Sequence, residues 1–350
     1  MNPIDDFTVT AADITYVGEG LQRPECILAE PDGSLWVADA RGGVVHIRPD
    51  GSQELIAQTL DTRFSATADD ADRFTSGTLP NGLAFDADGS LLISNFGTDR
   101  LERMTRDGRT EVLLEQIDGE PVGKVNFVLR DRLGRVWITV STRITNWMAA
   151  ISPRIADGYV AVLDEQGARI VADGFAFTNE IRFDAAEEWL YVVETTGRRI
   201  TRLRIGEGAR VEAREVFGPA DTGGFIDGIA FDAFGNLWGT HVMTDRIFAL
   251  TPEAEMRVIL DDTEPSKVAE LKTAFEADAI PPSCSLPMAE RSRPGSPRSP
   301  SAGRTCAMSI SARCVKPASP CSEVRLRACR WSIGRVLSRK DTTLDASNGR

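Results

Sequence analysis

One short pattern occurs five times within the first 280 residues of this 350-residue chain. Each copy has a polar opening residue, a small or apolar pair, an acidic turn that mostly reads Asp-x-x-Gly, and an aromatic-rich strand. Repetition preserves what the fold needs, so an opening position that keeps an oxygen-bearing side chain while changing its type is where function is expected. The opening residues, in chain order, are Glu25, Asn81, Asn126, Asn179 and Asp227.

The spacing of the copies predicts an all-β fold of the β-propeller class. The opening residues follow one another at intervals of 45 to 56 residues, with four strand signals in each interval. Propeller blades have periods of about 40–50 residues and four strands each. Asp-Gly pairs between alternating segments are typical of hairpin turns. Tryptophans at or near equivalent places are expected to fill the space between neighbouring blades; they are Trp36, Trp137, Trp189 and Trp238.

The opening residues are candidates for a metal site. In a propeller the first strand of each blade lines the central channel, so residues far apart in sequence meet at one end of it. Carboxylate and amide oxygens without thiolates or imidazoles form a donor set for Ca²⁺, Mg²⁺ or Mn²⁺ more than for Zn²⁺. The alternative is that these residues only start strands, and we prefer that reading for Asn81. A buried Glu25 is harder to explain that way, because an uncompensated carboxylate is expensive to bury.

At these residues the chain resembles the regucalcin/gluconolactonase family of six-bladed propellers, also described as senescence-marker-protein or LRE-like. The resemblance covers residues 15–260, which is five blades of six. It implies one divalent cation held by Glu25, Asn179 and Asp227, with Ca²⁺ preferred and Mg²⁺, Mn²⁺ or Zn²⁺ as alternatives. It also implies substrate contacts from Asn126 and from Lys124, which stands where the family often has Arg. The family's first-blade Glu-Gly-Pro is replaced here by Arg-Pro-Glu-Cys from position 23.

The implied activity is hydrolysis of a sugar lactone. A cation on the lactone carbonyl stabilises the developing oxyanion, and Asp227 would be both a metal ligand and the base that activates water. The alternatives are another metal-assisted esterase, or a non-catalytic or metal-free propeller similar to strictosidine synthase. Of the two histidines, His46 is interpreted as structural, and His241 as structural with substrate contact as the minority alternative. The sequence does not choose among lactones.

Two segments outside the repeat have expected roles. The stretch from Thr142 to Gly158 is too long for a hairpin turn and carries Trp147, so it is either a lid over the site or a surface loop on its own blade. Val268, Leu271 and Phe275 follow helical spacing and predict a short amphipathic helix.

The character of the chain changes at residue 281, which divides it into a propeller (1–280) and a tail (281–350). The tail has 13 Arg and Lys against 4 Asp and Glu, and five of the six cysteines. The sixth blade is due at this point, but the repeat does not continue. One interpretation is a disordered basic tail rich in Ser, Pro and Arg. We favour a frameshift, because a shifted reading of 282–334 with suitable codons restores strand and turn patterns of a sixth blade.

Without that blade, the first and fifth blades are expected to expose strand edges and apolar faces. The first ten residues resemble no secretory signal, and no apolar run has membrane-spanning length, so a cytoplasmic location is expected. The acidic propeller argues against a nucleic-acid partner and for a small molecule. The oligomeric state stays open.

Overall fold

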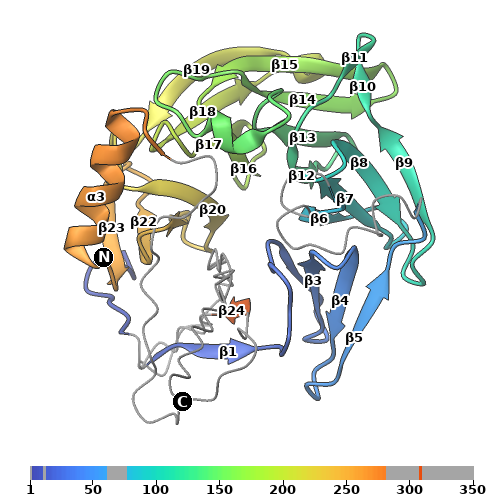
Figure 1. The fold of residues 1–350 in the computed structure, drawn as a ribbon, viewed down its shortest axis with the longest axis horizontal. Helices are drawn as coiled ribbons and strands as arrows, with labels where there is room; N and C mark the ends of the chain where they lie inside the picture. The colour runs from blue at the N-terminus through green and yellow to red at the C-terminus, as the bar shows by residue number, and fades with distance from the viewer. Residues whose placement is uncertain (1, 11–12, 61–76, 281–306, 310–350) are drawn as a thin grey trace, which may run out of the picture.

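The described part of the chain forms five four-stranded antiparallel sheets arranged as blades around a ring (Figure 1). The structure is a computed structural model, and it describes residues 2–10, 13–60, 77–280 and 307–309. In each blade the four strands follow one another in sequence, with the first strand innermost and the fourth at the rim. The predicted β-propeller is therefore confirmed.

Chain order within a blade runs from the innermost to the outermost strand. The five blades are β2 (Ile27–Ala29), β3 (Leu35–Asp39), β4 (Gly43–Ile47) and β5 (Gln53–Ala57); β6 (Pro80–Phe85), β7 (Leu91–Asn95), β8 (Arg100–Met104) and β9 (Thr110–Leu114); β12 (Val125–Arg130), β13 (Val136–Val140), β14 (Gly158–Asp164) and β15 (Gly167–Phe175); β16 (Thr178–Phe183), β17 (Trp189–Glu194), β18 (Arg199–Ile205) and β19 (Val211–Phe217); and β20 (Phe225–Phe231), β21 (Leu237–Val242), β22 (Arg246–Leu250) and β23 (Met256–Asp261).

The remaining elements are short. A two-residue hairpin joins β10 (Gln116–Ile117) to β11 (Glu120–Pro121), and β1 (Thr15–Val17) pairs antiparallel with β24 (Ala307–Ser309). The described residues also include two 3₁₀ helices, η2 (Trp147–Ala150) and η3 (Glu207–Ala209), and one longer helix, α3 (Pro265–Glu276). Among the described residues, no helix is long and apolar enough to cross a membrane.

The acidic turn of the repeat joins the first two strands of each blade. Its fourth residue has a positive φ, as at Gly89 (83°) and Gly235 (81°), a conformation that glycine adopts without the steric cost of a Cβ atom. In three blades the turn carboxylate also accepts a hydrogen bond from an indole N–H. Trp137 Nε1, for example, donates to Asp131 Oδ2 at 2.8 Å. In these three blades the repeat therefore links the turn to the tryptophan that follows it, which explains why the two recur together.

Tryptophans fill the space between blades, as the repeat predicts. Trp36, Trp137 and Trp238 are buried, and Trp137 belongs to a core shared by the first four blades. Trp189 is only partly buried, and the Arg202 guanidinium stacks over its ring at 4.3 Å. Three of the four positions are thus core positions.

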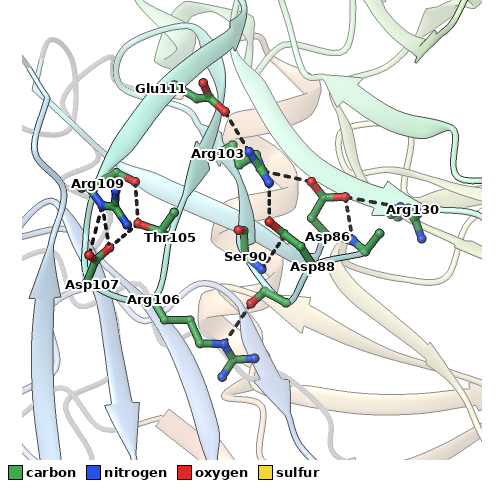
Figure 2. A network of polar contacts seen from close by, with 12 residues as sticks. Asp86, Asp88, Ser90, Arg103, Thr105, Arg106, Asp107, Arg109, Glu111 and Arg130 are labelled. Atoms are coloured by element: carbon green, nitrogen blue, oxygen red, sulfur yellow. Dashed lines mark hydrogen bonds and ion pairs between the residues drawn. The ribbon is translucent and has the colours of Figure 1, made fainter.

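Ion pairs join the blades at the end of the ring that carries the acidic turns (Figure 2). Arg103 contacts Asp86, Asp88 and Glu111 of its own blade, and Asp86 also pairs with Arg130 of the next blade. Arg106 reaches the first blade, where it forms a two-pronged pair with Glu30 at 2.9 Å. Arg106 and Arg130 therefore tie the second blade to both of its neighbours.

The N-terminal part of the chain packs on the apolar faces of the fifth and first blades that point away from the other blades. Ile4 and Val9 pack with Trp238, Ile247 and Ile259 on the face of the fifth blade that points away from the fourth. The Val9 N–H donates to the Ile259 carbonyl at 2.9 Å.

The first blade is covered in the same way. Leu21 and Val17 pack on Val37 and Val45, which face away from the second blade. The expectation that both apolar faces are exposed is therefore wrong. The described residues form five four-stranded blades, so a sixth blade stays a prediction. Apart from 307–309, the tail lies outside the described residues, so the structure does not test the frameshift hypothesis.

The predicted amphipathic helix is confirmed. It is α3, which begins with Pro265 at its first position, where the missing N–H of proline costs no hydrogen bond. Leu271 and Phe275 are buried against Phe225 and Val242 of the fifth blade. The Phe225 and Phe275 rings meet edge to face with centroids 4.9 Å apart.

We expect Ile4→Ala to lower the free energy of unfolding by about 2–4 kcal/mol, since Ile4 is 3% exposed and its removal opens a cavity on the fifth blade. Val258→Ala is the matched control, because Val258 lies next to Ile259 in β23 and is 45% exposed. Its truncation should change the free energy of unfolding by less than about 0.5 kcal/mol. Urea unfolding measures both. Equal effects of the two substitutions would show that the N-terminal segment does not cover this face.

Candidate metal and substrate site

Interruptions in strand pairing position four of the five opening residues. The pairing of first and second strands shifts between Pro80 and Leu83, Val125 and Phe127, Thr178 and Ile181, and Ile226 and Ile229. Asn81, Asn126, Asn179 and Asp227 lie within these shifts. Such irregularities bend a strand and re-aim a side chain, and they are frequent beside active sites. Glu25 has a different setting, two residues before β2 begins.

Asn179 and Asp227 are in direct contact. The Asn179 Nδ2 donates to Asp227 Oδ1 at 2.9 Å and lies 3.2 Å from Thr195 Oγ1. Both side chains are buried, Asn179 at 6% and Asp227 at 5% exposure. The amide nitrogen of Asn179 is thus directed at the carboxylate, and its Oδ1 accepts no hydrogen bond from the described part of the chain. That oxygen has the chemistry of a metal ligand.

Glu25, Asn81 and Asn126 form a second group, which Arg23 helps to connect. Arg23 Nε lies 3.1 Å from Glu25 Oε1, and Arg23 Nη1 donates to Asn81 Oδ1 at 3.3 Å. The Asn81 Nδ2 in turn donates to the Asn126 backbone carbonyl at 2.8 Å and lies 3.2 Å from its Oδ1. Asn81 is therefore more than a strand start, because its amide bridges the first three blades.

Lys124 is buried beside Asn126 with a carboxylate partner. Its Nζ lies 2.9 Å from Asp99 Oδ1 and 5.9 Å from the centre of the Phe96 ring, both of the second blade. Burial raises the pKa of Asp99, and Lys124 opposes that rise. Sequence reasoning missed Asp99, which no pattern in the repeat marks.

Hydroxyl groups connect the two groups of opening residues. Thr139 Oγ1 accepts from the Phe127 N–H at 3.0 Å and donates to the Asn179 carbonyl at 2.7 Å. Ser94 Oγ donates to the Asn126 carbonyl at 2.6 Å, and Thr195 Oγ1 to the Ile226 carbonyl at 2.7 Å. Each of the three bonds that a hydroxyl donates runs from the second strand of one blade, or the residue just after it, to the first strand of the next. A Ser or Thr at the end of the second strand is the sequence signal that could have found these contacts.

The loop between β13 and β14 lies across the same end of the ring. Trp147 of η2 is 2% exposed and packs edge to face on Phe96 of the second blade, with centroids 5.6 Å apart, and against Phe177 of the fourth. Ala40 and Leu79 belong to the same apolar cluster. Of the two interpretations of residues 142–158, this arrangement agrees with a lid over the site, since the loop packs on blades other than its own.

The donor types fit a hard divalent cation. Glu25 and Asp227 carry carboxylates and Asn179 an amide oxygen, and all three side chains are buried. The contacts given above join Asn179 to Asp227 and Glu25 to Arg23, and they do not bring Glu25 to the other two. Within the described residues, no three His, Cys, Asp or Glu side chains are grouped so that they could hold a metal. Glu25 precedes the first blade and Asp227 belongs to the fifth, so the two carboxylates come from the two ends of the series of blades.

The two histidines have structural partners. His46 stacks on Trp36 with centroids 4.1 Å apart, in agreement with its expected structural role. His241 is buried opposite Ile226, and its Nε2 lies 3.0 Å from Thr222 Oγ1. Asp39, Asn95 and Glu194 occupy the same place in three other blades, where each accepts a hydrogen bond from a backbone N–H ahead of the first strand. This equivalence indicates that His241 serves to join its second strand to the segment before β20.

Comparisons with known proteins agree with this architecture. The family model described as the SMP-30/Gluconolactonase/LRE-like region matches residues 66–268. The match covers more than half of the chain, which therefore belongs to this family. A search of curated sequences finds no match.

Solved structures share the fold at low identity. A gluconolactonase from Xanthomonas campestris is 21% identical over 73% of this chain and 84% of its own, with a TM-score of 0.56. Regucalcin from Agrobacterium tumefaciens, a calcium-binding protein, is 16% identical over 70% and 78%, with a TM-score of 0.53. A luciferin-regenerating enzyme is 15% identical over 72% and 78%, with a TM-score of 0.52.

We expect His241 to make the fold acid-sensitive. Burial lowers the pKa of His241 to about 4, with Arg246 contributing, whereas the unfolded chain takes up the proton near pH 6.5. The neutral imidazole of His241 contributes fully to the free energy of unfolding above pH 6.5. This contribution is lost as the pH falls toward 4, and at pH 5 the free energy of unfolding is lower by roughly 2 kcal/mol. His241→Asn, which places at this position the residue type of Asn95, should flatten the dependence of the melting temperature on pH between 7 and 5.

The control for this experiment is His46→Asn, because the pKa of His46 is also lowered but its imidazole is far less buried. Melting curves of the wild type and of His241→Asn that fall in parallel with pH would contradict the assignment.

Proposed function

We propose that the protein is a metal-dependent hydrolase that opens a sugar lactone, with Glu25, Asn179 and Asp227 holding one divalent cation. Family membership supports a lactonase-like propeller. The observation that carries the proposal is the buried Asp227 carboxylate, held at 2.9 Å by the Asn179 amide at one end of the ring. A Ca²⁺ ion suits this oxygen set best, and Mg²⁺, Mn²⁺ or Zn²⁺ are the alternatives.

The cation, when bound, would polarise the lactone carbonyl and stabilise negative charge on its oxygen. Asp227 takes a proton from water as the water oxygen attacks the carbonyl carbon. The ring C–O bond then breaks, and the ring oxygen receives the proton and becomes the hydroxyl of the open acid. Asn179 fixes the plane of the Asp227 carboxylate by its hydrogen bond to Oδ1, so that the base is already aimed when the substrate binds.

Asn126 and Lys124 are the proposed substrate contacts. Both are buried next to the site, and Asn126 is held at its carbonyl by Ser94 and Asn81. A sugar lactone offers several hydroxyls, which amide and ammonium groups can bind. The loop carrying Trp147 would exclude bulk water above them, which strengthens every electrostatic contact below it. The proposed partner is a small lactone, with no nucleic acid and no membrane.

We expect Asp227→Asn to lower kcat/KM for lactone hydrolysis by at least about 100-fold, because a missing general base costs roughly that much and a metal ligand is lost as well. The assay measures acid release from a panel of aldonolactones, before and after chelation and after metal is restored. Asp261→Asn is the matched control. Asp261 lies on β23, the outermost strand of the same blade, where it pairs with Arg246 of β22. This substitution should leave turnover within about twofold of the wild type.

Each alternative function predicts a different result. Metal binding without turnover of any lactone would point to another ester substrate or to a binding role. A thermal melt that neither chelator nor metal shifts would favour the metal-free propeller and would contradict the proposed ligands.

A further inference from the structure

The residue just before the third strand has a left-handed backbone in four of the five blades. These residues, in chain order, are Gly42, Asp99, Arg198 and Asp245, with φ between 45° and 95°. Glycine adopts this conformation without a steric cost, and Asp and Asn tolerate it better than most other residues. Because the four blades use different residues in the same turn, the turn does not require a carboxylate. The carboxylate of Asp99 is therefore explained by what it contacts.

Asp99 forms an ion pair with the next blade. Its Oδ1 lies 2.9 Å from Nζ of Lys124, which comes just before β12, and the Lys124 side chain is 3% exposed. The same Nζ lies 5.9 Å from the centre of the Phe96 ring. Trp147 of the loop between β13 and β14 packs edge to face on that ring. The ammonium is therefore held on the second blade, beside the ring that supports this loop.

The backbone of Lys124 is also fixed. Its N–H donates to the Thr142 carbonyl at 2.9 Å, and the Ser141 N–H donates to the Lys124 carbonyl at 2.9 Å. A free lysine side chain loses rotamer freedom when it binds a ligand, and this loss weakens binding. In Lys124 the ion pair with Asp99 restricts the ammonium before a ligand arrives, which reduces that loss.

The ion pair leaves part of the ammonium available to a ligand. An ammonium group has three N–H donors, and Asp99 lies on one side of it. Within the part of the chain that the structure describes, Nζ has no second oxygen or nitrogen acceptor. A buried donor without an acceptor is unfavourable. The site therefore favours a ligand that brings hydroxyl oxygens to Nζ.

We propose that Asp99 is a positioning residue, which holds the Lys124 ammonium so that its remaining N–H groups bind hydroxyl oxygens of the lactone. This inference rests on the proposed lactonase function. It requires the contribution of Asp99 to depend on the hydroxyls of the substrate, whereas an ion pair that only joins two blades would affect every substrate alike. Glucono-δ-lactone and δ-valerolactone are suitable probes, because they share the six-membered lactone ring and only the first carries hydroxyls.

The experiment compares kcat/KM for the two lactones in the metal-loaded full chain. Asp99→Asn removes the charge but keeps the side-chain shape and a residue type that tolerates the left-handed backbone. It should lower kcat/KM for glucono-δ-lactone by about tenfold, mainly through KM, because a hydrogen bond from a charged group is weakened. The value for δ-valerolactone should change by less than about twofold. Asp99→Gly, which places here the residue type of Gly42, should behave in the same way.

The matched control is Asp107→Asn, because Asp107 pairs with Arg109 in an exposed turn of the same blade. It should leave kcat/KM for both lactones unchanged. Lys124→Gln should reproduce the effect of Asp99→Asn, and the double variant should lose no more than either single variant, since the two residues act as one unit.

Calorimetric binding of the products, gluconate and 5-hydroxypentanoate, gives a readout independent of turnover. Preferential binding of gluconate that is weakened about tenfold in Asp99→Asn supports the inference. Equal losses for the two lactones in Asp99→Asn, or no loss for either, overturn it and leave the lactonase proposal standing. If neither lactone is opened, the proposed function fails. The inference about Asp99 is then decided by gluconate, and equal affinity of the wild type and Asp99→Asn for gluconate, or no binding by either, overturns it.

Discussion

The hydrogen bonds from Ser94, Thr139 and Thr195 to the first strand of the following blade are the contacts on which the arrangement of the site depends. The pairing of each of these first strands is interrupted at its opening residue, so backbone groups there lose their ladder partners. A buried backbone carbonyl without a partner is costly, and the hydroxyls supply the missing donors. They also couple neighbouring blades, which lets side chains from different blades hold one geometry.

Charges in the site are arranged as neighbouring pairs. Lys124 is matched by Asp99, Arg23 by Glu25, and the Asp227 carboxylate accepts from Asn179. Burial of these groups is tolerated because each has a partner, and the same burial makes the site sensitive to any added charge.

The sequence predicted the propeller, its five blades and α3, because turn glycines, alternating strands and helical spacing are local signals. It also placed four of the five opening residues correctly in the first strands of their blades, whereas Glu25 lies two residues before β2. It could not predict the interruptions in pairing, since these depend on two strands at once. The left-handed backbone of Arg23, with a φ of 44°, could not be predicted either, because a residue before proline is normally extended. Ile4 and Val9 carry no periodicity, and so their packing on the fifth blade was missed.

The covering of the fifth blade by the N-terminal segment has a consequence for the order of folding. Val9 meets Ile259 across nearly the whole propeller sequence, so this contact cannot form until the fifth blade has been synthesised. The blades themselves are built from neighbouring strands and can assemble one after another, whereas bringing such distant segments together has an entropic cost and is slow. The earliest residues of the chain are therefore among the last to reach their final place, and until then the nascent ring has an open side.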